Sequence, residues 1–190
     1  MKTYLMSGIL LLLLSSCASF RGDKVPDDFR KLSVETFREL EGTYAFEPDY
    51  YYTKQGNVAY DDVENHRNNL FRYVSKEKVI RDTMSTYKVS LRVLTSEQLE
   101  FSLFKDDSLD ARIVLGGKFK RGFFQLDNEM YDLRGIPFLF GSYSERKTRI
   151  GLSSQKDLLV YHAYGAGGGA LIVLSNGRSH SSLKSYNRIL

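Results

Sequence analysis

The chain has 190 residues, and its 27 basic and 23 acidic side chains leave a net charge of +4. This small positive excess speaks against nucleic acid as a partner, and the length suits one domain with a self-sufficient core. The single cysteine excludes a disulfide within the chain.

The N-terminal residues have the pattern of a cleavable signal peptide. One positive side chain, Lys2, precedes a short apolar run that ends with residues 10–14. A run of this length cannot comfortably cross about 30 Å of hydrocarbon at about 1.5 Å per helical residue, so a permanent transmembrane helix is the weaker interpretation. We therefore expect residues 1–16 to form a signal peptide that is removed.

The apolar run leads into Leu-Ser-Ser-Cys, ending at Cys17, and these four residues resemble the lipobox of bacterial lipoproteins. The resemblance implies that Cys17 takes a diacylglycerol, becomes the new N-terminus and anchors the chain to a membrane. Several acyl chains on one residue hold a protein durably on a bilayer. The alternative is an ordinary secretory signal cut near Ala18 or Phe20, which would leave a soluble protein.

The residues after Cys17 bear on where such a lipoprotein would be held. Ala18 does not match the Asp-type signal for inner-membrane retention in enteric bacteria. Residues 18–22 also lack the acid-rich export signal of Bacteroidetes surface lipoproteins. The lipoprotein resemblance therefore implies a place in the cell envelope, on the periplasmic face of the outer membrane rather than on the cell surface.

Residues 17–32 are expected to hold the lipidated N-terminus and a tether, because they are mostly small and polar and lack apolar periodicity. A single domain is predicted over residues 33–190. It should begin with a short helix of two turns, in which Ser33 is the N-cap and Val34, Phe37 and Leu40 share one side.

From Gly42 onward the apolar residues alternate with period two, which is the pattern of half-buried strands. Many short strands with short turns predict an all-β, antiparallel up-and-down meander, which would close into a barrel or fold as a sandwich to hide its edges. Connections too short for crossover helices exclude a parallel α/β sheet. The clearest strands are predicted around residues 88–93, 99–103, 109–115, 119–126, 130–133, 138–143, 148–152, 158–164, 170–174 and 183–189, with turns at 95–97, 105–107, 153–156 and 175–177.

Two segments do not fit a simple strand pattern. Residues 61–74 could form a helix on the barrel or, around residues 70–74, a strand, and the pattern favours helix for the first part. Residues 165–169, Gly-Ala-Gly-Gly-Gly, are predicted to form a flexible hairpin loop. A phosphate-binding loop would require a helix after the glycines, and a strand-like apolar run follows instead.

The sequence Phe-Arg-Glu-Leu-Glu-Gly-Thr-Tyr at residues 37–44 resembles the start of calycins, the lipocalins and fatty-acid-binding proteins, with Tyr44 where that family prefers Trp. Residues 186–190 are similar to the final calycin strand, whose Arg, here Arg188, commonly packs over the first-strand aromatic. The resemblance implies a calycin-like barrel with Tyr44 and Arg188 as closure residues, since a guanidinium on an aromatic face can also donate to backbone carbonyls. The alternative is a common strand opening and an exposed terminal charge. The whole chain also resembles uncharacterised lipoproteins of Bacteroidetes-type bacteria, which implies no activity.

Charge is unevenly distributed along the chain. Residues 23–62 hold five basic and ten acidic side chains, whereas residues 144–190 hold seven basic and two acidic ones. The C-terminal third is therefore a candidate basic patch for phosphate-bearing lipid headgroups or an acidic partner. The alternative is solvated strand faces and turns without a partner.

No segment carries a convincing catalytic or metal-binding motif, so we predict a non-enzymatic protein with no cofactor and no metal. The nucleophile elbow of the α/β-hydrolases is missing, and the histidines lack metal-ligand spacing. The residues weighed for chemistry, and predicted instead to be turn, surface or core residues, are Ser153, Ser154, Asp157, His66, His162, His180 and the Asp pairs at 61–62 and 106–107.

The aromatic content is high, with 13 Tyr, 12 Phe and no Trp. Inward aromatics can line a ligand cavity in a wide barrel or fill a narrow one, and Tyr50 to Tyr52 could form an exposed contact patch for glycan or protein. The first hypothesis is a membrane-tethered barrel that binds an apolar or amphipathic small molecule. The second is a structural or interaction lipoprotein that docks onto another envelope protein or component without an internal ligand.

Overall fold

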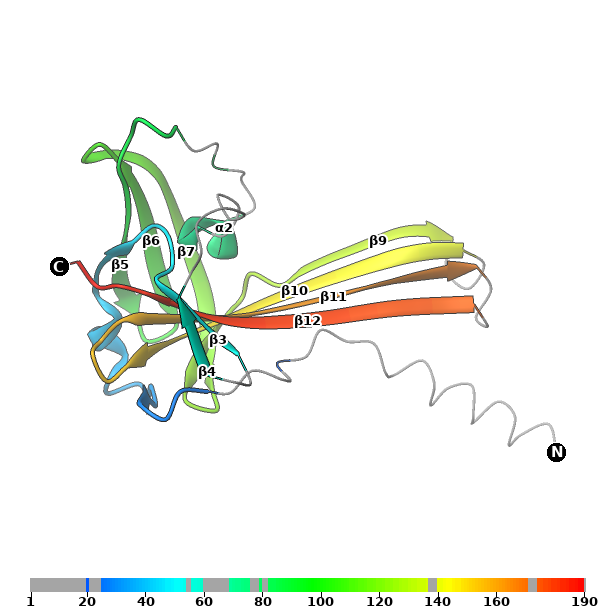
Figure 1. The fold of residues 1–190 in the computed structure, drawn as a ribbon, viewed down its shortest axis with the longest axis horizontal. Helices are drawn as coiled ribbons and strands as arrows, with labels where there is room; N and C mark the ends of the chain where they lie inside the picture. Colours follow the sequence, from blue (N-terminus) through cyan, green and yellow to red (C-terminus); the bar gives the residue numbers. More distant parts are fainter. Residues whose placement is uncertain are drawn as a thin grey trace.

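The computed structural model describes residue 20 and residues 25–53, 56–59, 69–75, 79, 82–136, 140–170 and 174–189. Antiparallel strands dominate it, and the two helices among the described residues are short (Figure 1). The strands are β1 (Phe29–Arg30), β2 (Gly42–Ala45), β3 (Tyr50–Thr53), β4 (Gly56–Ala59), β5 (Tyr87–Thr95), β6 (Gln98–Lys105), β7 (Ser108–Lys120), β8 (Phe123–Leu126), β9 (Met130–Ile136), β10 (Phe140–Ser153), β11 (Leu158–Ala170) and β12 (Leu174–Tyr186). The helices are η1 (Phe37–Leu40) and α2 (Leu70–Val74).

The strands form one sheet in the order β2-β5-β6-β7-β8-β10-β11-β12-β3-β4, with β1 and β9 also paired to β10. Every pairing is antiparallel. Most neighbours in the sheet also follow one another in the chain, as a meander requires. The predicted all-β, up-and-down antiparallel arrangement is confirmed.

The sheet is not closed into a barrel, which corrects the calycin-like closure expected from the sequence. The path ends at β4 because β12 takes β3 as its neighbour, where Leu183 pairs with Tyr52. Beyond β12, the backbone of the described residues meets β2 at the bridge between Tyr44 and Arg188 and at two flanking hydrogen bonds. The strand β2 and the residues after β12 therefore touch without a continuous ladder between them.

The molecule consists of a body and a projecting arm (Figure 1). The strand β10 belongs to both, because residues 140–146 pair with β9 and residues 149–150 pair with β8 in the body. The term arm is used here for residues 130–136, 140–146, 164–170 and 174–180, which pair with one another across four strands. At about 3.3 Å per residue, such an arm is about 20 Å long.

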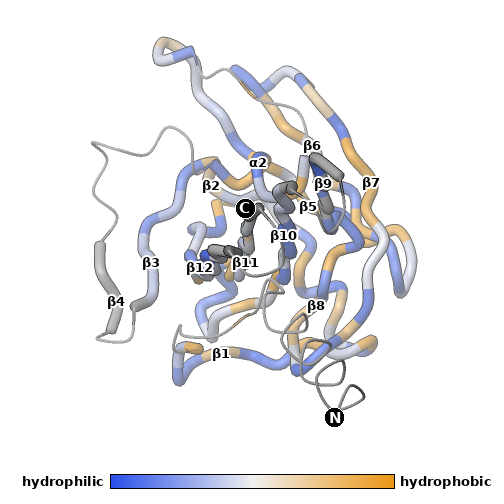
Figure 2. The backbone as a smooth tube through the Cα atoms, turned by 90° about the vertical axis from the view of Figure 1, so that its right-hand side faces the viewer, coloured by the Kyte–Doolittle hydropathy of each residue, from blue (hydrophilic) through white to orange (hydrophobic). Residues whose placement is uncertain are grey.

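The core of the body is formed by side chains from η1, α2 and one face of the sheet. Seen along the arm, the body strands lie around the central group β9–β12 (Figure 2). Ile150 and Val160 of the long strands face this core, whereas Leu159 and Tyr161 belong to a smaller cluster on the other face. The largest fully buried side chains include Tyr44, Tyr186, Phe37, Phe71, Phe101 and Phe124.

Part of the N-terminal segment packs against the smaller cluster. Phe20, Val25 and Phe29 pack on it, and β1 pairs with the end of β10. Residues 25–32, which the sequence assigned to a tether, therefore have fixed neighbours, because Val25 and Phe29 cover the outer face of the sheet and Leu32 packs into the main core.

The predicted helix after Ser33 is shorter than expected. It is the 3-10 helix η1, with Thr36 rather than Ser33 at its N-cap, and Val34 is 57% exposed. With about three residues per turn, residues i and i+3 of a 3-10 helix lie above one another. A single turn is therefore enough to bury both Phe37 and Leu40.

The glycine-rich residues 165–169 are strand, which corrects the predicted hairpin loop. β11 continues through them to Ala170, and residues 175–177, predicted as a turn, pair with residues 167–169. Backbone hydrogen bonds to the two long strands beside β11 hold the glycines in an extended conformation, because strand pairing needs no side chains. A Cβ on Gly167 would lie 2.6 Å from Cε1 of Tyr143, so this aromatic ring takes the place of a side chain there.

Other boundaries also differ from the prediction. The strand predicted at residues 119–126 is divided by a two-residue turn, in which Arg121 and Gly122 both have positive φ. The strands predicted at 138–143 and 148–152 are one strand, β10. Within residues 61–74, the part weighed as a strand is the helix α2, and residues 60–68 lie outside the described residues.

Candidate functional site

One face of the arm carries a polar trough. Ser144 pairs with Asp132 on one side and with Ala166 on the other, and Ala166 pairs with Arg178, so these residues share a face. A cavity of about 570 Å³ lies on this face. The side chains of this face that line it are Asp132, Arg134, Ser142, Ser144, Tyr164, Ala166 and Arg178, with Gly168 in the floor.

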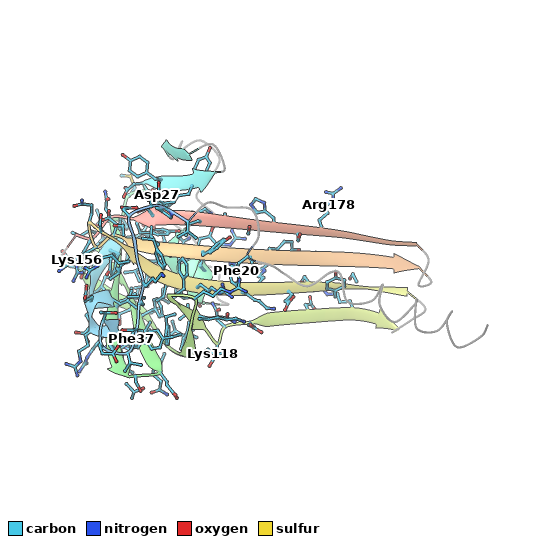
Figure 3. All side chains as sticks on the ribbon, turned by 90° about the horizontal axis from the view of Figure 1, so that it is seen from below. Phe20, Asp27, Phe37, Lys118, Lys156 and Arg178 are labelled. Atoms are coloured by element: carbon cyan, nitrogen blue, oxygen red, sulfur yellow. The ribbon has the colours of Figure 1, made fainter. Side chains whose placement is uncertain are left out.

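The sizes of the side chains give the trough its shape. The outer strands β9 and β12 carry the long side chains of Arg134 and Arg178, whereas the central strands carry Ser142, Ala166 and Gly168. With neighbouring strands about 4.8 Å apart, β9 and β12 are separated by about 14 Å. Figure 3 shows Arg178 on the arm part of β12, clear of the body. The trough therefore has a nearly bare floor between cationic walls.

The charges of the trough are predominantly positive. Nε of Arg134 donates to Oδ2 of Asp132 at 3.0 Å, and Nη2 lies 3.0 Å from the same oxygen. At the body end, the guanidinium of Arg146 lies 5.7 Å from the ring centroid of Tyr164. Within the part of the chain that the structure describes, Arg178 forms no ion pair. Three arginines on this face are thus opposed by one aspartate.

A buried polar cluster continues the same sheet face into the body. Nζ of Lys184 donates to the hydroxyl oxygen of Tyr73 and lies 4.7 Å from the centroid of its ring. The backbone carbonyl of Tyr73 accepts from Oγ1 of Thr148 at 3.0 Å and from Nδ2 of Asn128 at 2.6 Å. Oγ1 of Thr148 also lies 3.3 Å from Nδ1 of His162. This cluster joins α2 to β10, β11 and β12.

Burial controls ionisation in the cluster. It lowers the pKa of His162 to about 3, and the charge of Lys184 acts in the same direction. Burial also lowers the pKa of Lys184 to about 8. Tyr73, Thr148 and Lys184 are each 9% exposed or less, so these groups are withdrawn from solvent. We interpret the cluster as structural support where the polar arm face meets the apolar core.

The structure brings Tyr44 and Arg188 together. The guanidinium carbon of Arg188 lies 5.8 Å from the centroid of the Tyr44 ring. Nη1 of Arg188 donates to the carbonyl of Glu39 at 3.1 Å, and Nη2 donates to the carbonyl of Glu41. The Tyr44 hydroxyl donates to the carbonyl of Leu40 at 3.0 Å, and burial raises the pKa of Tyr44 to about 12.

The other residues singled out from the sequence are not gathered into one site. Cys17, His66 and the Asp pair at 61–62 lie outside the described residues. The backbone N–H of Asp157 donates to Oγ of Ser153 at 3.1 Å, which confirms these two as residues of the turn between β10 and β11.

The predicted basic patch at residues 144–190 is divided among different roles. The guanidinium of Arg149 lies 3.8 Å from the centroid of the Phe20 ring, on the outer face of the sheet. Arg146 and Arg178 instead lie on the trough face of the arm. The clustering of positive charge in the sequence thus corresponds to several separate environments in the fold.

Across the described ranges, no helix is long and apolar enough to span a membrane, and no three His, Cys, Asp or Glu side chains are grouped as they would be around a metal ion. Comparison of the chain with protein-family models, with curated proteins and with solved structures gives no match. The site must therefore be interpreted from its own geometry.

Neither the trough nor the buried cluster was predicted. Ser142, Ser144 and Arg146 alternate with period two, which is a signal for a polar strand face. Because residues 165–169 were predicted to form a loop, no strand was expected to form the floor of the trough. The polar face was therefore not recognised. Tyr73 and Lys184 are 111 residues apart, and no local pattern indicates their contact.

Proposed function

We propose that this chain is a non-enzymatic envelope lipoprotein, held on a membrane through Cys17, that uses its arm to contact another envelope component. The observation that carries this proposal is the four-stranded arm, which projects from the body and has a cationic trough on one face. Asp132, Arg134 and Arg178 are exposed there. Polar side chains held at fixed positions outside the core are suited to recognition.

Packing inside the body favours an external contact over an internal ligand. The described aromatic residues of the body include Phe37, Tyr44, Phe101 and Phe124, each less than 2% exposed. They pack with aliphatic side chains in one cluster, so they fill the interior. The proposal therefore assigns the contact surface to the arm.

The two ends of the chain support a further part of the proposal, a distant relation to the calycins. The support is the position of Arg188 over the ring of Tyr44 and its hydrogen bonds to two backbone carbonyls. The proposed relation concerns only how the ends meet, because the sheet itself stays open.

The anchor is tested by Cys17→Ala in cells that are fed a radiolabelled fatty acid. We expect the wild-type chain to be labelled and recovered with membranes, and we expect Cys17→Ala to lose the label. Ser19→Ala serves as the control and should retain label and location. A label that persists in Cys17→Ala would overturn the anchor.

The role of the arm is tested by placing a photo-crosslinking amino acid at Ser142, in the trough, or at Val114, which is 46% exposed on the body strand β7. Irradiation of living cells should give a crosslinked envelope component from position 142 and not from position 114. Equal products from both positions, or none from 142, would contradict a contact role for the arm.

A further inference from the structure

Resting on the contact role proposed for the arm, we infer that the trough binds the phosphate group of an anionic lipid headgroup. The arginines of the trough face and its serine hydroxyls are the donors that phosphate oxygens prefer. Arg134 and Arg178 line the trough from the opposite strands β9 and β12, and Ser142 and Ser144 lie on β10 between them. One bound phosphate can therefore receive donors from both sides and from the floor.

The dimensions of the trough favour a substituted phosphate. Its volume of about 570 Å³ falls in the range of small-molecule sites, about 300–1,000 Å³, and exceeds what a bare phosphate ion needs. Ala166 and Gly168 leave the floor of β11 nearly free of side chains, so a headgroup can lie along the strand. Tyr164 marks the body end of this floor.

Asp132 restrains Arg134 and also places a negative charge beside the proposed phosphate. Both contacts from Arg134 go to one carboxylate oxygen of Asp132. A guanidinium has five N–H donors, so Arg134 keeps donors for a ligand while its side chain is held on the wall. The negative charge of Asp132 nevertheless opposes an anion, which makes its removal an informative test.

The sequence order along the arm favours a lipid as the source of the phosphate. At the far end of the arm the strands finish at Ile136 and Ala170 or begin at Phe140 and Leu174. The tripeptides that join them are Pro-Phe-Leu and Leu-Ile-Val in the sequence. In the sequence, two residues separate Arg134 from the first tripeptide and four separate Arg178 from the second, so cationic and apolar residues follow one another as headgroup and acyl chain do in a lipid.

The test uses the mature chain, extracted in a nonionic detergent, and isothermal titration calorimetry. Short-chain phosphatidylglycerol is the main probe, and short-chain phosphatidylcholine, inorganic phosphate and an oligoglutamate peptide are compared with it. Arg134→Gln and Arg178→Gln should each weaken phosphatidylglycerol binding about tenfold, as expected for one charge-assisted hydrogen bond. Asp132→Asn should strengthen it several-fold. Arg92→Gln removes an exposed arginine from the body strand β5 and should leave binding within twofold.

Tight binding of phosphatidylglycerol that depends on the two arginines, with weak binding of the other probes, supports a lipid headgroup. Inorganic phosphate that binds as tightly overturns the lipid source, and preferred binding of oligoglutamate overturns the phosphate. Weaker binding in Asp132→Asn, or an equal loss in Arg92→Gln, also overturns the site. Because these titrations do not depend on acylation, failure of the anchor would appear separately in the mass of the extracted chain.

Discussion

Arg188 joins the C-terminal residues to the start of the body through two backbone carbonyls and one aromatic ring. Those carbonyls, of Glu39 and Glu41, flank the point where η1 passes into β2. The backbone N–H of Arg188 also donates to Oδ1 of Asp157 at 3.1 Å, which adds the turn before β11. One residue thus connects three segments that are distant in the sequence.

Replacement of Arg188 by Ala should lower the free energy of unfolding by about 2–3 kcal/mol, because two carbonyls lose a charged donor and Tyr44 loses its cationic neighbour. Urea denaturation followed by circular dichroism measures this change. The matched control is Arg92→Ala, at an exposed position on β5, which should change stability by less than about 0.5 kcal/mol. Equal effects of the two substitutions would show that the contacts of Arg188 contribute little.

His162 should make the protein sensitive to acid. Its pKa is about 3 in the folded chain, below the value of about 6.5 expected when the chain is unfolded. The stabilisation is therefore fully present above about pH 6.5 and is lost as the pH falls toward 3, and the loss at pH 5 should be about 2 kcal/mol. His162→Gln should reduce the difference in unfolding free energy between pH 7 and pH 5 by this amount. Parallel pH profiles for the two proteins would contradict the assignment.

At the residue scale, the sequence indicated which residues are important better than it indicated what surrounds them in the fold. Tyr44 and Arg188 were singled out from the two ends of the chain, and they lie together. In the sequence analysis, Lys184 contributed only to the count of basic residues. His162 was considered only as a histidine without metal-ligand spacing. Their burial depends on α2 lying over β11 and β12, and no periodicity in the sequence indicates that packing.

Gly117 shows how closely β7 and β8 approach each other. A Cβ at this position would lie 2.5 Å from the backbone oxygen of Gln125 and 2.6 Å from Cε1 of Phe124. At its neighbour Gly116, the nearest atom is the flexible carboxylate oxygen of Asp127 at 3.1 Å. An added side chain would therefore clash with backbone at Gly117 but only with a flexible side chain at Gly116.

Gly117→Ala should lower the free energy of unfolding by about 2–3 kcal/mol, because the backbone of the β7–β8 hairpin must shift to make room. Gly116→Ala should cost less than about 1 kcal/mol, since only a side chain has to move. Thermal and urea unfolding of the two variants give the comparison. A similar loss in both would mean that strand propensity rather than contact sets the cost.

At the element scale, period-two alternation predicted the strands well where each has one apolar face, as in β5 and β6. It failed at residues 165–169 and 175–177 of the arm, which are rich in glycine and small polar residues and look like loop. The ladder itself decides there, because β10 and β12 supply backbone partners to every residue of β11. The 3-10 form of η1 could not be predicted either, since it depends on how Phe37 and Leu40 reach the core.

At the scale of the whole molecule, the N-terminal segment limits the distance between an anchor and the body. Phe20 packs against Tyr161 with ring centroids 4.9 Å apart, on the outer face of the sheet. Phe20 is three peptide steps from Cys17, and extended chain covers at most about 3.6 Å per step. A lipid on Cys17 would therefore hold this face of the body within about 11 Å of its own attachment point.

The division into body and arm could not be predicted from the sequence. Strand length depends on how far each neighbour continues, and β9 extends β10 beyond the end of β8. Composition indicated one domain of adequate size, and the body has the expected core. The arm adds strands without adding to that core, so core-based reasoning gives no reason to expect it.

The outer strands of the arm have an additional consequence. In the described chain, β9 pairs only with β10, and the arm portion of β12 pairs only with β11. Each therefore presents a row of backbone donors and acceptors along which a second chain could add. Asp132, Arg134 and Arg178 lie on these two strands, and charged side chains on edge strands hinder such addition.

The triple substitution Asp132→Val, Arg134→Val, Arg178→Val should therefore make the protein self-associate through its arms. Analytical ultracentrifugation should show oligomers that grow with concentration, whereas Asp110→Val, Lys118→Val and Arg92→Val together, at exposed positions on the body strands β7 and β5, should leave the wild-type distribution. A triple arm variant that sediments like the wild type would count against this. The charges proposed to recognise a headgroup would also keep crowded copies from polymerising edge to edge.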